Sequence, residues 1–245
     1  MRVVSFNVHH GTVGRAGPVD PERLGAVCAA FDADVVALQE VDLGTRRTGG
    51  ADLAAVVGRA CAMASVFGPS RRYPGGWYGN ALLVRGDIES WSVARLPKVP
   101  WWRWWQEPRT LLQATARVDG RALSLAVTHL AVAPAVNGPQ LERVLALAAR
   151  RPDPLVVLGD LNRSPSMIEP AVTAAGLTYV PHGPTIPVRT PRRTIDHCLV
   201  SSDIAVDRVE VRATEMSDHA ALLVDLAIPP TSVSPVIDAP RGTAR

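Results

Sequence analysis

Short apolar runs alternate with amphipathic stretches along most of the chain. Runs rich in Val, Ile and Leu, or alternating apolar and polar residues, predict ten β-strands. They lie at 2–8, 35–40, 80–84, 88–96, 110–118, 122–128, 155–158, 195–200, 206–213 and 220–227. Asp119 and Gly120 separate two of these runs, which predicts a two-residue hairpin turn.

Helices are predicted between the strands, where apolar residues recur at helical spacing. They lie at 20–31, 51–62 and 137–150, and a shorter one follows Ser164. Pro21 and Pro165 each follow a residue that can cap a helix, and proline suits the first helical position. Many strands with few helices, joined partly by hairpins, predict an α+β fold of two packed sheets flanked by helices.

The domain organisation follows from where this pattern stops. Residues 1–228 are expected to form one domain, because the elements continue without a linker across them. From 229 to 245 the chain consists mainly of Pro, Ser, Thr and Ala without periodicity, so we expect a disordered tail.

Composition narrows the class of protein. Of the 245 residues, 47% are hydrophobic and 20% are charged, which is enough apolar material for a packed core. No run approaches 18 uninterrupted apolar residues, so no membrane-spanning helix is expected. The N-terminus lacks the apolar stretch of a secretory signal, and Cys28, Cys61 and Cys198 lie far apart. We therefore expect a cytoplasmic protein with reduced cysteines.

The charge balance leaves the class of substrate open. The net charge is only +3, weaker than that of a dedicated nucleic-acid-binding domain. Lys98 is the only lysine, and guanidinium groups fit phosphate well, but we attribute the arginine total to codon bias and look for function in individual arginines. Five loop arginines have two interpretations, an anion-binding rim or a solvated loop: Arg71, Arg72, Arg189, Arg192 and Arg193.

Polar residues stand repeatedly where predicted strands end. Asn7, Glu40, His129 and Asp160 each close an apolar run, and other polar residues adjoin such runs, namely Asn162, Asp196, Asp218 and His219. Strand ends are rigid, so side chains there can converge on one site. Taken singly, each has an ordinary structural interpretation, such as a turn-forming Asx residue or a hydrogen-bonded histidine.

Taken together, these side chains fit metal-assisted phosphodiester hydrolysis. Glu40 and Asp218 can hold a hard divalent cation, and the two histidines can act as acid, base or phosphate stabiliser. The amides of Asn7 and Asn162 can donate to a phosphate, and Asp160 can take a proton from the attacking water.

The sequence resembles the endonuclease/exonuclease/phosphatase superfamily, whose members include deoxyribonucleases, apurinic endonucleases, sphingomyelinases and phosphatases. The matching segments follow one another in the family order from Asn7 to His219. They are Ser-Phe-Asn-Val, Leu-Gln-Glu-Val, Tyr-Gly-Asn-Ala-Leu-Leu, Glu-Pro-Arg, Thr-His-Leu, Gly-Asp-Leu-Asn, Ile-Asp-His and Ser-Asp-His. The resemblance implies a four-layered α/β sandwich, in agreement with the layered pattern above.

By this resemblance, Glu40 is the principal ligand of Mg²⁺ or Mn²⁺, with Asn7 and Asp218 beside it. Many apurinic endonucleases have an aspartate two residues after the first asparagine, whereas this chain has His9 there. A second metal held by an acidic side chain at that position is therefore not expected.

The resemblance also implies roles for the residues around the phosphate. Asp160 orients or deprotonates the water, Asn162 and His219 contact the phosphate, and Asp196 pairs with His219. His129 matches the histidine that deoxyribonucleases and sphingomyelinases use near the leaving group. Further residues are expected to contact the substrate: Asn80, Glu107, Arg109, Trp104 and Arg192.

The segment 100–106 carries four of the six tryptophans and leads directly into Glu107. We expect two of the four to pack on the sheet, because adjacent side chains diverge. The others have three interpretations: stacking on bases, insertion into a lipid surface, or contact with a protein partner. The four residues are Trp101, Trp102, Trp104 and Trp105.

The sequence thus predicts a monomeric, cytoplasmic, Mg²⁺-dependent phosphoesterase. It would hydrolyse a phosphodiester or a phosphomonoester by in-line attack of an activated water. Three substrate classes stay open, namely nucleic acid, a lipid reached through Trp101–Trp105, and a small phosphorylated metabolite. A non-catalytic interaction module is the alternative from another class.

Overall fold

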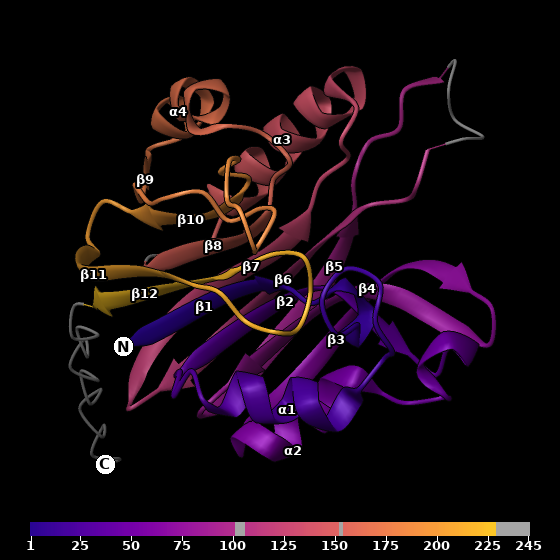
Figure 1. Cartoon of the computed structure of the whole chain (residues 1–245). Coiled ribbons are helices and arrows are strands. Elements are labelled where there is room, and N and C mark those ends of the chain that lie inside the picture. The colour runs from indigo at the N-terminus through magenta and orange to yellow at the C-terminus, as the bar shows by residue number, and fades with distance from the viewer. Residues whose placement is uncertain (101–105, 152–153, 229–245) are drawn as a thin grey trace, which may run out of the picture.

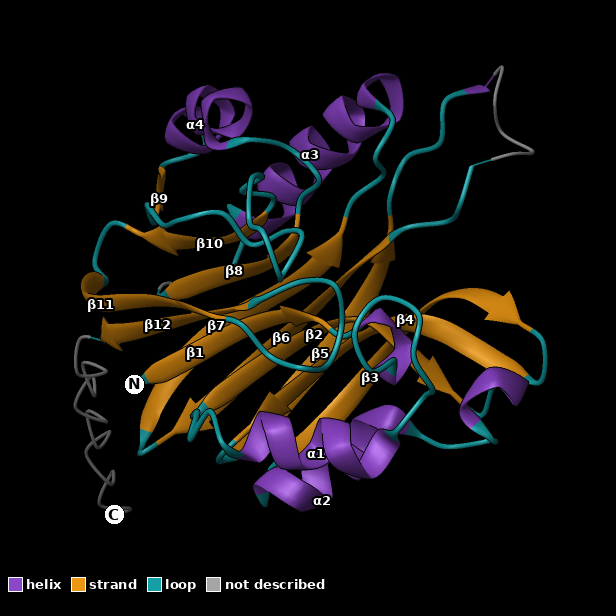
Figure 2. Ribbon diagram, viewed as in Figure 1, coloured by secondary structure: helices purple, strands orange, loops and turns teal. Residues whose placement is uncertain are grey.

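A computed structural model describes residues 1–100, 106–151 and 154–228. Two six-stranded sheets pack face to face (Figures 1 and 2). The first has the order β11-β12-β1-β2-β4-β3, where the strands are β1 (Arg2–Asn7), β2 (Val35–Leu43), β3 (Ala64–Tyr73), β4 (Gly76–Val84), β11 (Ala205–Arg212) and β12 (Ala221–Ala227). The second has the order β5-β6-β7-β8-β10-β9, where the strands are β5 (Asp87–Arg95), β6 (Thr110–Val118), β7 (Arg121–His129), β8 (Leu155–Asp160), β9 (Leu177–Tyr179) and β10 (Asp196–Ser201).

Two pairs of helices cover the outer faces of the sheets (Figure 2). The first sheet carries α1 (Pro21–Ala29) and α2 (Leu53–Cys61), and the second carries α3 (Pro134–Ala148) and α4 (Pro165–Ala174). Two short 3₁₀ turns, η1 (His9–Gly11) and η2 (Arg46–Thr48), follow β1 and β2. The order helices, sheet, sheet, helices confirms the α/β sandwich of four layers.

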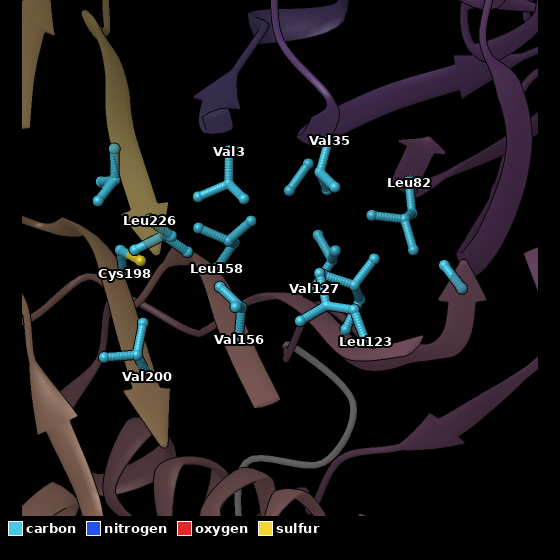
Figure 3. Close-up of a cluster of buried hydrophobic side chains, with 14 of the residues drawn as sticks. Val3, Val35, Leu82, Leu123, Val127, Val156, Leu158, Cys198, Val200 and Leu226 are labelled. Atoms are coloured by element: carbon cyan, nitrogen blue, oxygen red, sulfur yellow. The ribbon is translucent and has the colours of Figure 1, made fainter. Parts of the chain in front are cut away.

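Three apolar clusters hold the layers together. The central one fills the space between the sheets and includes Val3, Val35, Leu82, Val127 and Leu158 (Figure 3). A second lies between the first sheet and its helices, and a third lies between the second sheet and its helices. Burial on both faces explains why the central strands read as continuous apolar runs.

Strand direction brings the polar strand ends to one place. β1 runs parallel to β2, and β7 runs parallel to β8, so the carboxyl ends of each pair lie at the same edge. Asn7 is opposite Gln39 in the first sheet, and His129 is opposite Asp160 in the second. Because β1 also packs on β8, the two edges meet across the interface between the sheets.

Most predicted elements are confirmed, but the start of α3 was wrong. The sequence placed it at Asn137, whereas the helix begins at Pro134. The Asn137 side chain is buried and donates to the carbonyls of Ala131 and Leu161, at 2.6 and 2.8 Å. It ties the helix to the loops beside the site instead of capping the helix.

Two strands were absent from the sequence prediction. β3 is an edge strand that carries Gly68, Pro69 and two arginines, so its apolar alternation is weak. β9 has only three residues, Leu177–Tyr179, and also lies at an edge. The predicted tail at 229–245 and the tryptophans at 101–105 lie outside the described residues.

The predicted hairpin turn at Asp119 and Gly120 is confirmed, and of the two predicted helix caps only Asp20 accepts a hydrogen bond from its helix. Asp119 and Gly120 both have positive φ, as a tight hairpin turn requires, and they join β6 to β7. Asp20 caps α1 by accepting a hydrogen bond from the amide of Arg23 at 3.0 Å. Ser164 precedes α4, but its hydroxyl contacts Ser166 and no backbone amide.

The cysteines and the lengths of the helices are seen directly in the structure. All three cysteines are free, and Cys28 and Cys198 are buried. Burial raises the pKa of Cys198 to about 12, which fits a packing role. In the part of the chain that the structure describes, no helix is both long and apolar enough to cross a bilayer.

Candidate active site

Glu40 reaches the site through an irregularity in β2. The pairing of β2 with β4 slips between Leu38 and Val41, which is the pattern of a β-bulge. Glu40 there has φ of 59°, a left-handed conformation that is uncommon for a side-chain-bearing residue. Four other residues around the site also have positive φ, namely His9, His10, Asn162 and Ser217. Such concentrated backbone strain is typical of functional sites.

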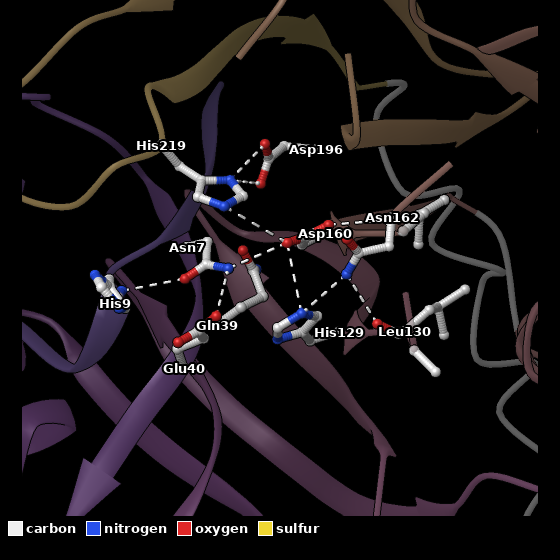
Figure 4. A network of polar contacts seen from close by, with 12 residues as sticks. Asn7, His9, Gln39, Glu40, His129, Leu130, Asp160, Asn162, Asp196 and His219 are labelled. Atoms are coloured by element: carbon white, nitrogen blue, oxygen red, sulfur yellow. Dashed lines mark hydrogen bonds and ion pairs between the residues drawn. The ribbon is translucent and has the colours of Figure 1, made fainter. Parts of the chain in front are cut away.

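Asn7 joins the two sheets at the centre of the site (Figure 4). Its buried amide donates to Glu40 Oε1 and to Asp160 Oδ2, both at 3.1 Å. Its Oδ1 accepts a hydrogen bond from the backbone amide of His9 at 3.1 Å. Both amide protons are thereby fixed, and the carboxylates of Glu40 and Asp160 are held on either side of one side chain.

Asp160 is a buried carboxyl that faces two imidazoles. Its Oδ2 lies 3.5 Å from His129 Nε2 and 3.9 Å from His219 Nε2. Its Oδ1 accepts a hydrogen bond from the backbone amide of Asn162 at 2.9 Å. Burial and the charge of Asp196 raise the pKa of Asp160 to about 7, against the opposing effect of His219. A carboxyl with such a pKa can exchange a proton near neutral pH.

His219 is held by the carboxylate of Asp196. Its Nδ1 lies 2.9 Å from Asp196 Oδ2, which also accepts a hydrogen bond from the hydroxyl of Thr185 at 2.5 Å. Burial lowers the pKa of His219, but the charge and hydrogen bond of Asp196, with Asp160 and Asp218 nearby, outweigh burial and raise it to about 9. At neutral pH this side chain is an imidazolium whose Nε2 faces the site.

His129 lies on the other side of Asp160 and is neutral. Burial and the positive charges of Arg109 and His219 lower the pKa of His129 well below its usual range. The side-chain amide nitrogen of Asn162 (Nδ2) lies 3.1 Å from His129 Nε2 and also donates to the carbonyl of Leu130 at 3.0 Å. Because an amide nitrogen only donates, His129 Nε2 acts as an acceptor.

Possible metal ligands gather around Glu40. Its carboxylate and one ring nitrogen each of His9 and His10 lie within 4.8 Å of one another. His9 Nδ1 is 3.8 Å from Asp218 Oδ1, and Nδ1 of both histidines lacks a hydrogen-bond partner. Burial, with the charges of Arg47 and His9, lowers the pKa of His10 to about 4 and leaves a neutral nitrogen that can bind a metal. The donor set of carboxylates and imidazoles fits a divalent cation.

The structure brings most of the predicted site residues together. Asn7, Glu40, His129, Asp160, Asn162, Asp196 and His219 form one connected network, and Asp218 adjoins it through His9. Asn80 is buried and donates to the carbonyl of Thr110 at 3.2 Å, so it supports the start of β6. Glu107 pairs with Arg109 at 3.2 Å and with Arg71 at 3.7 Å. The Arg192 side chain is exposed, and Trp104 lies outside the described residues.

Two residues of the network were missed in the sequence. His10 follows His9 directly, and this His-His pair after the first asparagine was the available signal. Thr185, which holds Asp196, stands in a loop without any pattern around it. Its role depends on a contact between positions 11 residues apart, and no periodicity shows such a contact.

Comparison with known proteins adds family and structural matches. The model of the endonuclease/exonuclease/phosphatase family matches residues 4–219. An endonuclease/exonuclease/phosphatase from Beutenbergia cavernae superposes with a TM-score of 0.79 and 25% identity, over 93% of this chain and 71% of that one.

Two further structures share the fold at lower identity. The human Nocturnin catalytic domain, solved with bound sulfate, has a TM-score of 0.68 and 20% identity, over 94% of this chain and 93% of that one. The mannosyl-6-phosphatase Bt3783 of Bacteroides thetaiotaomicron has a TM-score of 0.71 and 16% identity, over 93% of this chain and 100% of that one. A search of curated proteins found no match.

Proposed function

The chain belongs to the endonuclease/exonuclease/phosphatase family and is therefore a phosphoester hydrolase, and from this premise we propose a specific reaction. The protein hydrolyses a phosphodiester or a phosphomonoester by in-line attack of an activated water, with a divalent metal as cofactor. One observation carries the proposal most directly: buried Asp160 faces two imidazoles and is joined to Glu40 through Asn7.

Asp160 is the base for the attacking water in this proposal. Its pKa of about 7 lets the carboxylate form near neutral pH and take up the proton that the water loses. Its hydrogen bonds with Asn7 and Asn162 fix the orientation of the two carboxylate oxygens. The water would thus be aligned before it reacts.

His219, His129 and Asn162 surround the phosphate. The His219 imidazolium, kept charged by Asp196, stabilises negative charge that develops on the phosphate oxygens. Neutral His129 accepts a hydrogen bond at Nε2 and lies on the opposite side of Asp160, where it can contact the leaving group. Asn162 keeps His129 oriented.

Glu40 would hold the metal, with Asn7 and Asp218 beside it and His9 and His10 within reach. A bound Mg²⁺ or Mn²⁺ supplies Lewis-acid stabilisation of the phosphate charge. Carboxylate ligands favour these ions, and the imidazoles shift the preference from Mg²⁺ toward Mn²⁺.

A panel of chromogenic phosphodiesters and phosphomonoesters, assayed with Mg²⁺, Mn²⁺ and EDTA, tests the reaction. Asp160→Asn keeps the shape but removes the base, so we expect kcat to fall by roughly 10²–10⁴-fold. The matched control is Asp207→Asn, which changes an exposed aspartate on β11 and should leave kcat unaltered. Full activity in excess EDTA, or near-native kcat for Asp160→Asn, would overturn the assignment.

The physiological setting stays part of this proposal. We propose that the protein works in the cytoplasm, where free cysteines such as Cys28, Cys61 and Cys198 stay reduced. The monoester arm of the panel matters, because one structural relative is a mannosyl-6-phosphatase. Hydrolysis of monoesters alone would place this chain among the phosphatases.

A further inference from the structure

A basic groove lies beside the active site, between the β3–β4 hairpin and the end of β5. It has a volume of about 560 Å³, within the range of ligand-binding clefts. Five of its nine lining residues are Arg or Lys, and none is acidic. These five are Arg71, Arg72, Arg95, Lys98 and Arg109.

Most of this positive charge is not neutralised within the protein. Arg71 and Arg109 share a single carboxylate, that of Glu107. Arg72, Arg95 and Lys98 form no ion pair with any carboxylate in the described part of the chain. The five cations of the groove face one carboxylate, a local excess of four positive charges, whereas the whole chain has a net charge of only +3. Such a concentration attracts a polyanion.

The groove adjoins the candidate active site through Arg109. Leu111 pairs with Thr128, so Arg109 stands just before β6, at the edge where β7 ends in His129. The carbonyl of Thr110, the residue after Arg109, accepts a hydrogen bond from the Thr128 hydroxyl at 3.1 Å, which sets this end of the groove beside His129. A substrate with its phosphate at Asp160 can therefore extend past His129 into the groove.

The walls of the groove offer flat stacking surfaces as well as charge. The guanidinium carbon of Arg72 lies 4.5 Å from the centroid of the Trp77 ring. The guanidinium carbon of Arg71 lies 5.1 and 5.2 Å from the ring centroids of Tyr73 and Tyr78, which support this side chain but lie outside the lining of the groove. Nucleobases stack on aromatic rings and on guanidinium planes, whereas sugars and inositol rings have no planar face of this kind.

We propose that this groove binds the nucleotide next to the scissile phosphate, so that the substrate is a single-stranded oligonucleotide. The inference rests on the proposed phosphoesterase function. Arg72 and Arg95 contact the adjacent backbone phosphate, and Arg72 with Trp77 forms the surface on which the base stacks.

Binding can be measured without catalysis. The probe is a fluorescein-labelled tetrathymidylate, followed by fluorescence anisotropy in excess EDTA. The double variant Arg72→Gln/Arg95→Gln should bind at least tenfold more weakly, and the slope of log K against log salt should shrink by about 0.7, since one phosphate is no longer neutralised. Both residues are exposed, so the fold should persist, and a thermal melt checks this.

Two further variants separate the groove from general charge. Arg121→Gln removes an exposed arginine at the β6–β7 turn, at the end of β7 away from His129, and should not weaken binding. Arg72→Lys keeps the charge but removes the planar group, and we expect roughly tenfold weaker binding because stacking is lost. Equal weakening by Arg121→Gln and Arg72→Gln would overturn the proposal.

The last arm separates this inference from the proposed function. Bis(4-nitrophenyl) phosphate is too small to reach the groove, so its hydrolysis by wild type and by Arg121→Gln reports the phosphoesterase reaction alone, and the two rates should be equal. If wild type hydrolyses no phosphoester but binds tetrathymidylate through Arg72 and Arg95, the proposed function fails while the groove stands. Failure to bind tetrathymidylate, or equally strong arginine-dependent binding of inositol hexakisphosphate or phosphatidylserine vesicles, would overturn the oligonucleotide assignment.

Discussion

Three titratable side chains at the centre of the site have pKa values shifted in different directions by burial and by neighbouring charges. The pKa of Asp160 is raised to about 7 and that of His219 to about 9, whereas the pKa of His129 is lowered. At neutral pH these three side chains are therefore an imidazolium (His219), a neutral imidazole (His129) and a carboxyl that exchanges its proton (Asp160). Divergent pKa values among neighbouring groups are a common property of acid–base catalysts.

His219 gives this site a measurable pH dependence of stability. Its pKa is about 9 in the folded chain and about 6.5 in an unfolded one, so the folded state favours the charged form. This contribution is complete below pH 6.5 and is lost as the pH rises through 9. The free energy of unfolding of wild type relative to His219→Gln should fall by up to about 3 kcal/mol between pH 6 and 10. Urea titrations in EDTA measure this difference, and a constant difference would contradict the assigned ion pair.

The imidazoles near Glu40 lead to a prediction about metal choice. His10→Asn removes a nitrogen donor but leaves the carboxylates, so Mn²⁺ affinity should fall by roughly tenfold or more while Mg²⁺ affinity changes little. Isothermal titration calorimetry with each ion measures both affinities. His182→Asn, a histidine outside the Glu40 cluster, is the matched control. If Mn²⁺ and Mg²⁺ affinity fall equally, His10 does not contact the metal.

At the scale of single elements, strand ends were predictable and their local distortions were not. Asn7, His129 and Asp160 stand at the ends of clear apolar runs, so their convergence could be inferred. The bulge that turns Glu40 toward the site has no signature in apolar alternation. His10 and Thr185 were missed for the same reason, since both depend on loop conformation and not on periodicity.

The bulge at Glu40 can be tested with a matched pair of variants. Glu40→Ala and Glu40→Gly both remove the carboxylate, so both should lose metal binding to the same extent. Because φ at this position is positive, the glycine variant should be more stable than the alanine variant by about 1 kcal/mol. Thermal or urea unfolding of the two variants measures the difference. An alanine variant of equal or greater stability would show that this backbone carries no strain.

At the scale of the whole molecule, the site depends on the packing of the two sheets. Leu158 lies in the central apolar cluster, two residues before Asp160 on β8. Leu158→Ala should lower the free energy of unfolding by about 2–5 kcal/mol, the usual cost of such a cavity. The control Val206→Ala, at an exposed position on β11, should cost less than about 1 kcal/mol. Urea unfolding measures both values, and a cost below 1 kcal/mol for Leu158→Ala would contradict its place in the core.

The order of strands in the first sheet has a consequence for protein synthesis. β1 lies between β2 and β12, and the Ser217 hydroxyl donates to the carbonyl of Asn7 at 2.6 Å. β1 thus keeps an unpaired edge until β12 has been synthesised. Asn7, Glu40 and Asp160 are translated before His219, so a nascent chain cannot assemble the complete site until His219 and β12 have left the ribosome. Hydrolytic competence would therefore arise only after that point, as a single event and not by degrees.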